Sequence, residues 1–301
     1  MSAIHLVVNP RAGGGTGARR VHDARDALAA VGDVIVRETL RAGDETRLAV
    51  EAHQQGARAL AVLGGDGTVS NAARGLLQQR SAVPIAVLAA GTGNDFAKSF
   101  GAPVHDYKAM AALLGSGCTR TIDAGCVDDV TFVGAAGFGF DVHVLAKLAA
   151  RRGSTGRATY AVTALGALRT YRGFEVRVEG HTGTGDAMSS RLLLLVFANG
   201  RYFGGAFCIA PDASLHDGAL DMIRIADAPT ARRVSLLARA VGGAHIRCPE
   251  VSTVRNTEYI VTFSEPPRFE TDGELHLASD STVRVRSLPN ALRVVAPQAT
   301  P

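Results

Sequence analysis

Three glycine-rich segments, each placed directly after a short apolar run, constrain the fold of this chain more than any other feature. NPRAGGGTG follows AIHLVV, GGDGT follows ALAVL, and AAGTGNDFA follows PIAVL. Stretches with helical spacing lie between the apolar runs, as does one more strand-like run, VIVRET. This alternation of strands and helices over roughly the first 125 residues predicts a mostly parallel sheet covered on both faces.

Because the carboxyl ends of parallel strands gather at one edge of a sheet, the three glycine-rich loops are expected to converge there. Glycine lets backbone N–H groups approach an anion closely, and the helix that follows each loop adds partial positive charge. The first loop has neither the G-x-x-x-x-G-K-[ST] spacing of a Walker loop nor the G-x-G-x-x-G spacing of a dinucleotide fold. The pattern predicts a phosphate-binding edge of another kind.

Asp66 stands among three glycines in GGDGT, where a bare phosphate cradle would not place a carboxylate. A divalent cation removes the conflict, because Mg²⁺ is commonly held by one or two carboxylates together with substrate phosphates. Asp66 would then act on the metal directly or through water. The alternative is a turn-forming or helix-capping aspartate.

The second half of the sequence reads as β-rich. FEVRVEG, SRLLLLVFAN, ALDMIRI, EYIVTF and TVRVRS are short strand-like runs bounded by turn residues, and residues 181–190 read as an exposed hairpin loop. Residues 142–172 predict two helices around a basic turn that contains Arg151, Arg152 and Arg157. These arginines either meet anionic lipid headgroups or form a solvated turn on the β domain.

The composition argues against several other classes of protein. The longest apolar run is far shorter than the ~20 residues of a membrane span, and the first residues lack the features of a secretory signal. Four cysteines occur without C-x-x-C pairing, so we expect neither a disulfide framework nor a zinc site. The net charge of +4 comes with no basic stripe and no tryptophan, which disfavours nucleic acid as a partner. We therefore expect a cytoplasmic protein.

Six segments together resemble one family, the bacterial diacylglycerol kinase-like lipid kinases, which include the YegS-like kinases and are related to sphingosine and ceramide kinases. The segments are VVNPRAGGG, GGDGTVSNAARGL, AAGTGNDFAKSFG, FANGRYFGGAFCIAPDASLHDGALDM, FETDGEL and PNALRVVAP. The resemblance implies an α/β plus β fold, with a Rossmann-like or phosphofructokinase-like nucleotide-binding domain and an antiparallel β-sandwich domain. It implies an ATP-binding domain at 1–125 plus 288–298, a lipid-substrate domain at 126–287, and an active site between them.

The resemblance also assigns residues to the phosphate donor. Those expected to contact ATP are Asn9, Pro10, Arg11, Ala12, Gly13, Thr39, Gly64, Gly65, Asp66, Gly67, Thr68, Thr92 and Asn94. Asp95 is expected to join Asp66 in an acidic network around the catalytic metal, and Asp123 is a further candidate for it. From the residues alone, Thr39 also fits an ordinary strand end, and Asn94 and Asp95 fit helix caps.

The residues expected to act on the phosphate acceptor lie in the segment FETDGELH. The Asp272-Gly273 pair predicts a tight turn that projects Glu274 from a hairpin tip, and a hydroxyl acceptor needs a carboxylate to orient it and take its proton. Without the resemblance, Glu274 reads as a solvated turn residue. With it, Glu274 is the expected base.

A second metal hypothesis concerns DASLHDGALD. A turn there can bring Asp217 close to backbone carbonyls, which suits Mg²⁺ or Ca²⁺ but also fits a plain turn. The resemblance implies a structural Mg²⁺ held by Asp217 and the carbonyls of Ser214 and Ala219.

These observations predict an ATP- and Mg²⁺-dependent kinase that phosphorylates a hydroxyl of diacylglycerol or a related lipid, at the inner face of a membrane. An NAD kinase, a sphingoid, ceramide or glycolipid kinase, and a non-catalytic nucleotide sensor stay open as alternatives. GGDGT alone does not choose among them, because NAD kinases share it. Whether the chain forms a homodimer is left open.

Overall fold

The computed structural model describes residues 2–41, 43–91, 93–150, 157–180 and 188–298. The chain divides into two compact units, which are treated separately below. Unit 1 comprises Met1–Ala124 and Pro289–Pro301, and unit 2 comprises Gly125–Leu288. The chain passes from one unit to the other within two paired strands, β5 (Thr119–Val127) and β15 (Thr282–Val295).

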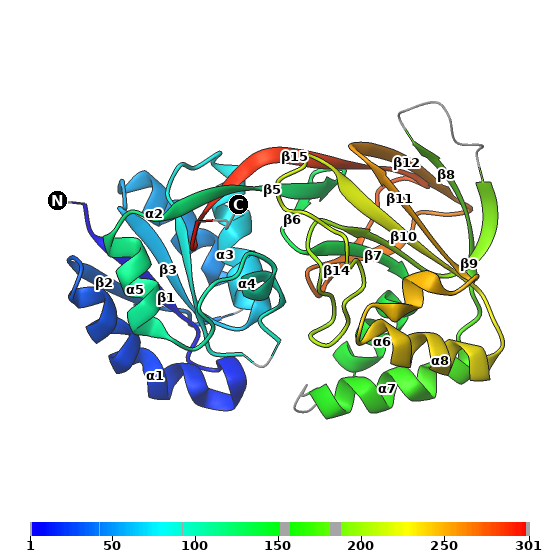
Figure 1. The fold of residues 1–301 in the computed structure, drawn as a ribbon, viewed down its shortest axis with the longest axis horizontal. Helices are drawn as coiled ribbons and strands as arrows, with labels where there is room; N and C mark the ends of the chain where they lie inside the picture. Colours follow the sequence, from blue (N-terminus) through cyan, green and yellow to red (C-terminus); the bar gives the residue numbers. More distant parts are fainter. Residues whose placement is uncertain (1, 42, 92, 151–156, 181–187, 299–301) are drawn as a thin grey trace. The chain divides into compact units, whose positions relative to one another are not determined.

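Unit 1 alternates strands and helices along the chain (Figure 1). Its elements are β1 (Ile4–Val8), α1 (Ala12–Ala29), β2 (Val34–Glu38), α2 (Asp44–Gln54), β3 (Ala59–Gly64), α3 (Asp66–Gln78), β4 (Ile85–Ala89), α4 (Asp95–Ser99) and α5 (Tyr107–Gly115). The strands pair in parallel in the order β4-β3-β1-β2, and every residue of β1, β3 and β4 is buried. Runs of Val, Leu, Ile and Ala without polar alternation suit strands that are covered on both faces.

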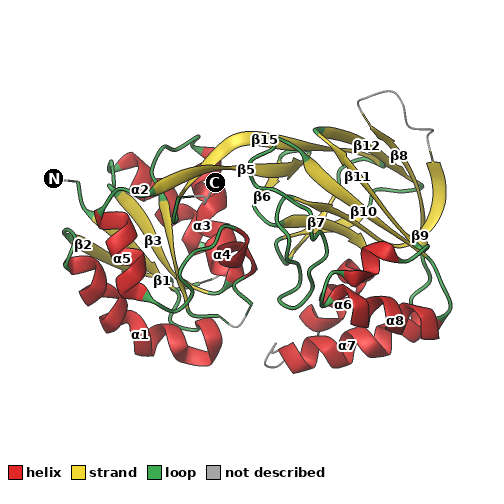
Figure 2. Ribbon diagram, in the orientation of Figure 1, coloured by secondary structure: helices red, strands yellow, loops and turns green. Residues whose placement is uncertain are grey.

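Helices of unit 1 pack in two groups, α1 with α5 and α2 with α3, with the sheet between them (Figures 1 and 2). One helix begins earlier than its sequence pattern indicated: the helix that follows the second glycine-rich segment begins at Asp66, so the end of GGDGT forms its first turn. In α1, Gly13 to Gly15 have positive φ and non-helical backbone angles, so the regular helix follows these glycines, as the helical spacing between AIHLVV and VIVRET indicated.

Unit 2 is an antiparallel β structure with helices on one side (Figure 2). Besides parts of β5 and β15, its elements are β6 (Val130–Phe132), β7 (Ala135–Gly139), α6 (Phe140–Ala149), α7 (Arg157–Thr170), β8 (Phe174–Gly180), β9 (Met188–Ala198), β10 (Leu220–Ala226), α8 (Thr230–Ala240), a 3₁₀ turn (Ala244–Arg247), β11 (Val251–Asn256), β12 (Glu258–Phe263), β13 (Arg268–Thr271) and β14 (Glu274–Leu277). The predicted helix pair corresponds to α6 and α7, whereas α8 was not predicted.

Strand β9 lies at the centre of unit 2 and pairs with β7, β8 and β10. From Leu194 to Ala198, its side chains alternate between two hydrophobic clusters. Leu194 and Val196 pack with α6, α7 and α8, whereas Leu195 and Phe197 pack within the sandwich against residues of β12, β13 and β15. The predicted fold class, α/β plus an antiparallel β-sandwich, is confirmed.

Among the helices of the described residues, none is both long and apolar enough to cross a membrane. The predicted loop at 181–190 lies largely outside the described residues, as do Arg151, Arg152 and the side chain of Arg157.

Candidate functional site

The first glycine-rich loop of unit 1 is held by Asn9, directly after β1. Its side-chain Nδ2 donates to Thr68 Oγ1 at 2.9 Å, and its Oδ1 accepts from the backbone N–H of Arg11 at 3.0 Å. Gly13, Gly14 and Gly15 follow with φ of 58°, 67° and 90°, a conformation that side-chain-bearing residues rarely adopt. The loop therefore exposes backbone rather than side chains, while its base is tied to the loop after β3.

Asp66 joins the second loop to the third. It is the first residue of α3, and its two carboxylate oxygens accept from the backbone N–H groups of Asn94 at 2.7 Å and Asp95 at 2.6 Å. A Cβ at Gly91 would lie only 2.8 Å from Gly65 Cα, so these loops approach as closely as two glycines allow. The three glycine-rich loops predicted to converge are thus linked side by side.

The remaining donor-side residues occupy the same edge. Asn94 donates from Nδ2 to Gly91 O at 3.1 Å, and its side chain does not cap α4. Asp95 begins α4, with Lys98 Nζ 3.8 Å from its Oδ1. The backbone N–H of Thr39 donates to Val8 O at 2.9 Å at the end of β1. Pro10, Arg11 and Ala12 lie at the start of α1, Gly64 ends β3, and Gly67 lies in the first turn of α3, whereas Thr92 lies outside the described residues.

Two acidic residues at the start of α2 were missed by the sequence reasoning. Glu45 is buried, and its Oε1 lies 3.4 Å from Asn9 Nδ2. The carboxylate of Asp44 accepts from the N–H groups of Leu40 and Arg41, and these hydrogen bonds, chiefly that of Leu40, lower its pKa. The Asp-Glu pair at the start of a helix, in the segment that follows a strand ending at the same edge, is the sequence signal that could have indicated them.

Asp123 lies on β5, in the part of the strand that belongs to unit 1. Its side chain is buried, and its Oδ1 accepts from the backbone N–H of Asn290 at 2.8 Å. This hydrogen bond links β5 to β15, and a role of Asp123 near the catalytic metal stays a prediction.

In unit 2, the turn predicted at Asp272 and Gly273 is confirmed. These two residues have φ of 51° and 89° and connect β13 to β14, with Glu274 paired opposite Thr271. Two positive φ angles are typical of the type I′ hairpin turn that an Asp-Gly pair favours. Glu274 is half-buried at the start of β14.

Carboxyl groups hold this turn on two sides. Asp272 accepts from the N–H groups of Val133, Gly134 and Ala135, at 2.8 to 3.2 Å. Glu270 Oε2 accepts from the N–H of Gly273 at 2.6 Å. Sequence reasoning did not find Glu270, because its position in β13 reads as an ordinary strand residue.

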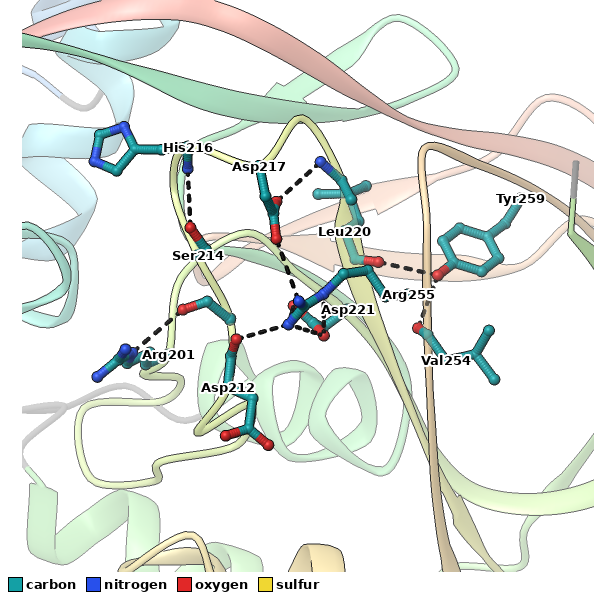
Figure 3. A network of polar contacts seen from close by, with 12 residues as sticks. Arg201, Asp212, Ser214, His216, Asp217, Leu220, Asp221, Val254, Arg255 and Tyr259 are labelled. Atoms are coloured by element: carbon teal, nitrogen blue, oxygen red, sulfur yellow. Dashed lines mark hydrogen bonds and ion pairs between the residues drawn. The ribbon is translucent and has the colours of Figure 1, made fainter. Parts of the chain in front are cut away.

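The loop proposed to hold a structural metal is shown in Figure 3. Asp217 Oδ1 accepts from Ala219 N–H at 3.1 Å, and its Oδ2 lies 3.5 Å from Arg255 Nη1. Arg255 also donates to both carboxylate oxygens of Asp221. The backbone N–H of His216 donates to the hydroxyl of Ser214 at 3.3 Å. A cationic side chain from β11 thus already lies beside Asp217, and a metal there would share its carboxylate with Arg255.

A cation at the glycine-rich edge would need ligands beyond the protein side chains. Among the described residues, no group of three or more His, Cys, Asp or Glu side chains is gathered as a cation site. Each oxygen of Asp66 accepts one backbone hydrogen bond and retains a second lone pair. This arrangement fits a hydrated Mg²⁺ that is held largely by phosphate oxygens.

Unit 1 also contains a hollow of about 490 Å³ at the opposite edge of the sheet. Its lining includes Arg58 and Pro84, which directly precede β3 and β4 in the chain. Ligands of open α/β sheets bind beyond the carboxyl ends of the strands instead. We assign this hollow no role.

Comparison with protein families matches both units. Residues 3–127 match the diacylglycerol kinase catalytic domain, and residues 134–296 match the YegS C-terminal NAD kinase beta sandwich-like domain. A diacylglycerol kinase of Mycobacterium tuberculosis is 32% identical over 301 residues, which cover 98% of this chain and 95% of the relative.

Two further similarities agree with this. A protein of Pseudomonas putida described as "Probable lipid kinase YegS-like" is 31% identical, with 92% of each chain covered. The crystal structure of a diacylglycerol kinase from Bacillus anthracis superposes with a TM-score of 0.75 at 20% identity, covering 99% of this chain and 97% of that one, and so supports the fold. The chain belongs to the diacylglycerol kinase-like, YegS-type family of lipid kinases.

Proposed function

We propose that this lipid kinase transfers the γ-phosphate of ATP to a hydroxyl of diacylglycerol or a closely related lipid, with Mg²⁺ bound to the nucleotide. Unit 1 is the proposed ATP-binding domain and unit 2 the proposed lipid domain. One observation carries the donor assignment: Asn9–Thr68 and Asp66–Asn94/Asp95 hydrogen bonds join three glycine-rich loops at the carboxyl ends of β1, β3 and β4.

Each donor-side group has a distinct proposed task. Backbone N–H groups of the loops that follow β1 and β3 bind the phosphate oxygens of ATP. Asp66 and Asp95 would hold the Mg²⁺ that accompanies the nucleotide, and the ion would neutralise charge on the transferring phosphoryl group. Lys98, near Asp95, offsets part of the negative charge at this edge.

Glu274 is the proposed base for the acceptor. It accepts a hydrogen bond from the lipid hydroxyl and takes the proton as that oxygen attacks the γ-phosphorus in line with the leaving β-phosphate oxygen. The new O–P bond forms as the bond to ADP breaks. The confirmed Asp272–Gly273 turn supports this assignment, because a two-residue hairpin fixes the direction of the next residue closely.

Apolar features of unit 2 support a lipid acceptor. A narrow cavity of about 50 Å³ is lined by apolar side chains, among them Phe140, Leu168 and Leu193. On α7, Val162 and Leu165 are 70% and 52% exposed. Exposed apolar side chains on a helix suit contact with a membrane surface, and we propose peripheral binding through this helix.

The structural Mg²⁺ at Asp217, with the carbonyls of Ser214 and Ala219, remains a separate proposal. Arg255 lies beside the same carboxylate, so the metal would add to an existing ion-pair network. Thermal unfolding of the Arg255→Met variant with and without Mg²⁺ tests it, because the metal should stabilise the variant more than the wild type.

The function itself is tested by incubating the wild-type protein with labelled ATP and Mg²⁺ in separate reactions. The acceptors are a total lipid extract, vesicles with diacylglycerol, a sphingoid base, ceramide and NAD, with products identified by mass. We expect a lipid phosphate monoester, formed most rapidly from diacylglycerol. Label only in the NAD reaction would favour an NAD kinase, and ATP binding without transfer to any acceptor would favour a sensor.

A further inference from the structure

Two buried carboxyl side chains meet next to the hairpin turn that carries Glu274. Asp141, in the first turn of α6, is 3% exposed, and Glu270, on β13, is 1% exposed. Gly137 of β7 lies beside both of them. A Cβ at that glycine would overlap Asp141 Oδ2 and lie 3.0 Å from Glu270 Oε1. The two carboxyl groups therefore converge over a residue that has no side chain.

The hydrogen-bonding capacity of these two carboxyl groups is only partly used. Within the part of the chain that the structure describes, both oxygens of Asp141 and Oε1 of Glu270 have no hydrogen-bond partner. Glu270 Oε2 accepts from Gly273 N–H at 2.6 Å. Two ionised carboxylates in such a place would repel each other, whereas a single proton lets one carboxyl group donate to the other.

Electrostatics agree with this geometry. Burial raises the pKa of Asp141 to about 7, and the N–H groups at the start of α6 offset this only in part. Burial also raises the pKa of Glu270 well above its ordinary value, and the negative charges of Asp141 and Asp272 raise it further. Both groups thus favour the protonated form, and protonation of one relieves the other.

Arg233, the cation that lines the same cavity as Asp141, is paired with other groups. It donates to the carbonyls of Ala228, Leu168 and Tyr171 and pairs with Asp227. Among the described residues, no ion pair to Asp141 or Glu270 is formed. A proton is therefore the available counter-charge.

Other titratable groups around the pair are neutral or bonded elsewhere. Burial raises the pKa of the Tyr171 hydroxyl, which keeps it protonated, and burial lowers the pKa of His143 on α6, which favours its neutral form. On β14, His276 Nε2 lies 2.8 Å from Thr271 Oγ1. Asp272 is the remaining acidic neighbour, with its carboxylate bound to three backbone N–H groups.

We propose that Asp141 and Glu270 hold one proton between them and act as a positioning pair for Glu274. The inference rests on the proposed function, because it concerns the orientation of the proposed base. With the proton in place, Glu270 keeps its hydrogen bond to Gly273, and the turn presents Glu274 in one direction. Without the proton, repulsion between the two carboxylates would pull Glu270 away from Gly273 and loosen the turn.

The test compares two variants of Glu270. Glu270→Ala removes the acceptor for Gly273 N–H, and we expect kcat to fall by ~10- to 100-fold while KM for lipid and ATP stays within about twofold, as for a small misplacement of a reacting group. Glu270→Gln keeps an acceptor oxygen and should recover kcat to within about threefold of wild type. Asp280→Ala is the matched control, because Asp280 also accepts a backbone N–H, that of Thr282, in the loop between β14 and β15.

A second readout does not depend on activity. Infrared spectra of the wild type near neutral pH should contain a protonated-carboxyl band that disappears in the double variant Asp141→Asn/Glu270→Gln. Absence of that band, wild-type kcat in Glu270→Ala, or no recovery in Glu270→Gln would each overturn the proposal. If the wild type phosphorylates no lipid, the proposed function fails, and the infrared comparison still decides whether the pair shares a proton.

Discussion

The two loop regions that carry the proposed chemistry are held by different chemical groups, backbone amides in one and side-chain carboxyl groups in the other. In unit 1, glycines and backbone N–H groups dominate, and the carboxylate of Asp66 is held by the amides of Asn94 and Asp95. In unit 2, the turn before Glu274 is held by the side-chain carboxyl groups of Glu270 and Asp272. One region is organised around backbone donors, and the other around buried acids.

This difference matches the two chemical tasks. Phosphate oxygens are the same in every ATP molecule, and backbone N–H groups bind them without titrating. A hydroxyl acceptor must lose a proton, so its side of the reaction needs a carboxylate whose position is set by other groups. We therefore expect the acceptor region to be the more sensitive of the two to pH and to single side-chain changes.

Glu274→Gln should have the largest effect. The amide has the size of the carboxylate but cannot take a proton, so we expect kcat to fall by about 10²- to 10⁴-fold, the usual contribution of a general base. Thermal unfolding should be unchanged, because Glu274 is only half-buried. Glu265→Gln, an exposed glutamate in the preceding turn between β12 and β13, should keep wild-type turnover. Comparable kcat for the two variants would contradict the base assignment.

Asp66→Ala should affect both activity and stability. Two N–H groups lose their acceptor, which we expect to cost about 1–3 kcal/mol of unfolding free energy, and turnover should fall by at least ~10²-fold. Asp106→Ala is the matched control, because Asp106 caps α5 by accepting from Ala109 N–H at 2.9 Å. The control should lose stability alone. Equal turnover in both variants would show that Asp66 serves only to hold its loop.

Thr68→Val should have a smaller effect, confined to the donor side. The valine keeps the shape but removes the hydroxyl that accepts from Asn9 Nδ2, so we expect KM for ATP to rise by about tenfold or less and stability to fall by about 1 kcal/mol. Thr46→Val removes a hydroxyl that donates to Asn71 O between α2 and α3. If steady-state kinetics give both variants the same KM for ATP, the Asn9–Thr68 link does not order the phosphate loop.

Local motifs predicted much of both regions. The convergence of the glycine-rich loops followed from strand–helix alternation, and the hairpin at Asp272 and Gly273 followed from one dipeptide. The sequence also indicated the β-rich second half. Each of these features depends on residues that are close together in the chain or on a regular topology.

The missed features depend on residues far apart in the sequence. Asp141 and Glu270 meet only because β7, β13 and α6 pack together, and no local pattern distinguishes either residue from a surface acid. Helix α8 was missed for another reason: its sequence, TARRVSLLARA, is amphipathic, but it lies among strand-like runs and its three arginines gave it a polar appearance. Arg233 in that helix is in fact buried, with backbone carbonyls as acceptors.

Asp141→Asn should have the smallest effect of these substitutions. The pH dependence of its Tm tests the role of the buried acids in unit 2. The pKa of Asp141 is about 7 in the folded protein, well above the value of an unfolded aspartate. At low pH both states hold the proton, and as pH rises the unfolded state loses it first, so this group makes the folded state progressively less favourable up to the folded pKa. Asparagine is neutral throughout. The difference in Tm between Asp141→Asn and wild type should therefore grow by a few degrees between about pH 5 and pH 8.

Asp280→Asn provides the opposite sign, because hydrogen bonds to the backbone N–H of Thr282 and the hydroxyl of Ser281 lower the pKa of Asp280. Its contribution is present above the unfolded pKa and is lost as pH falls, so the Tm difference of this variant should change only in the acidic range. Differential scanning calorimetry of the three proteins across pH measures both curves. A Tm difference for Asp141→Asn that stays constant or shrinks with rising pH would mean that Asp141 is ionised in the folded state.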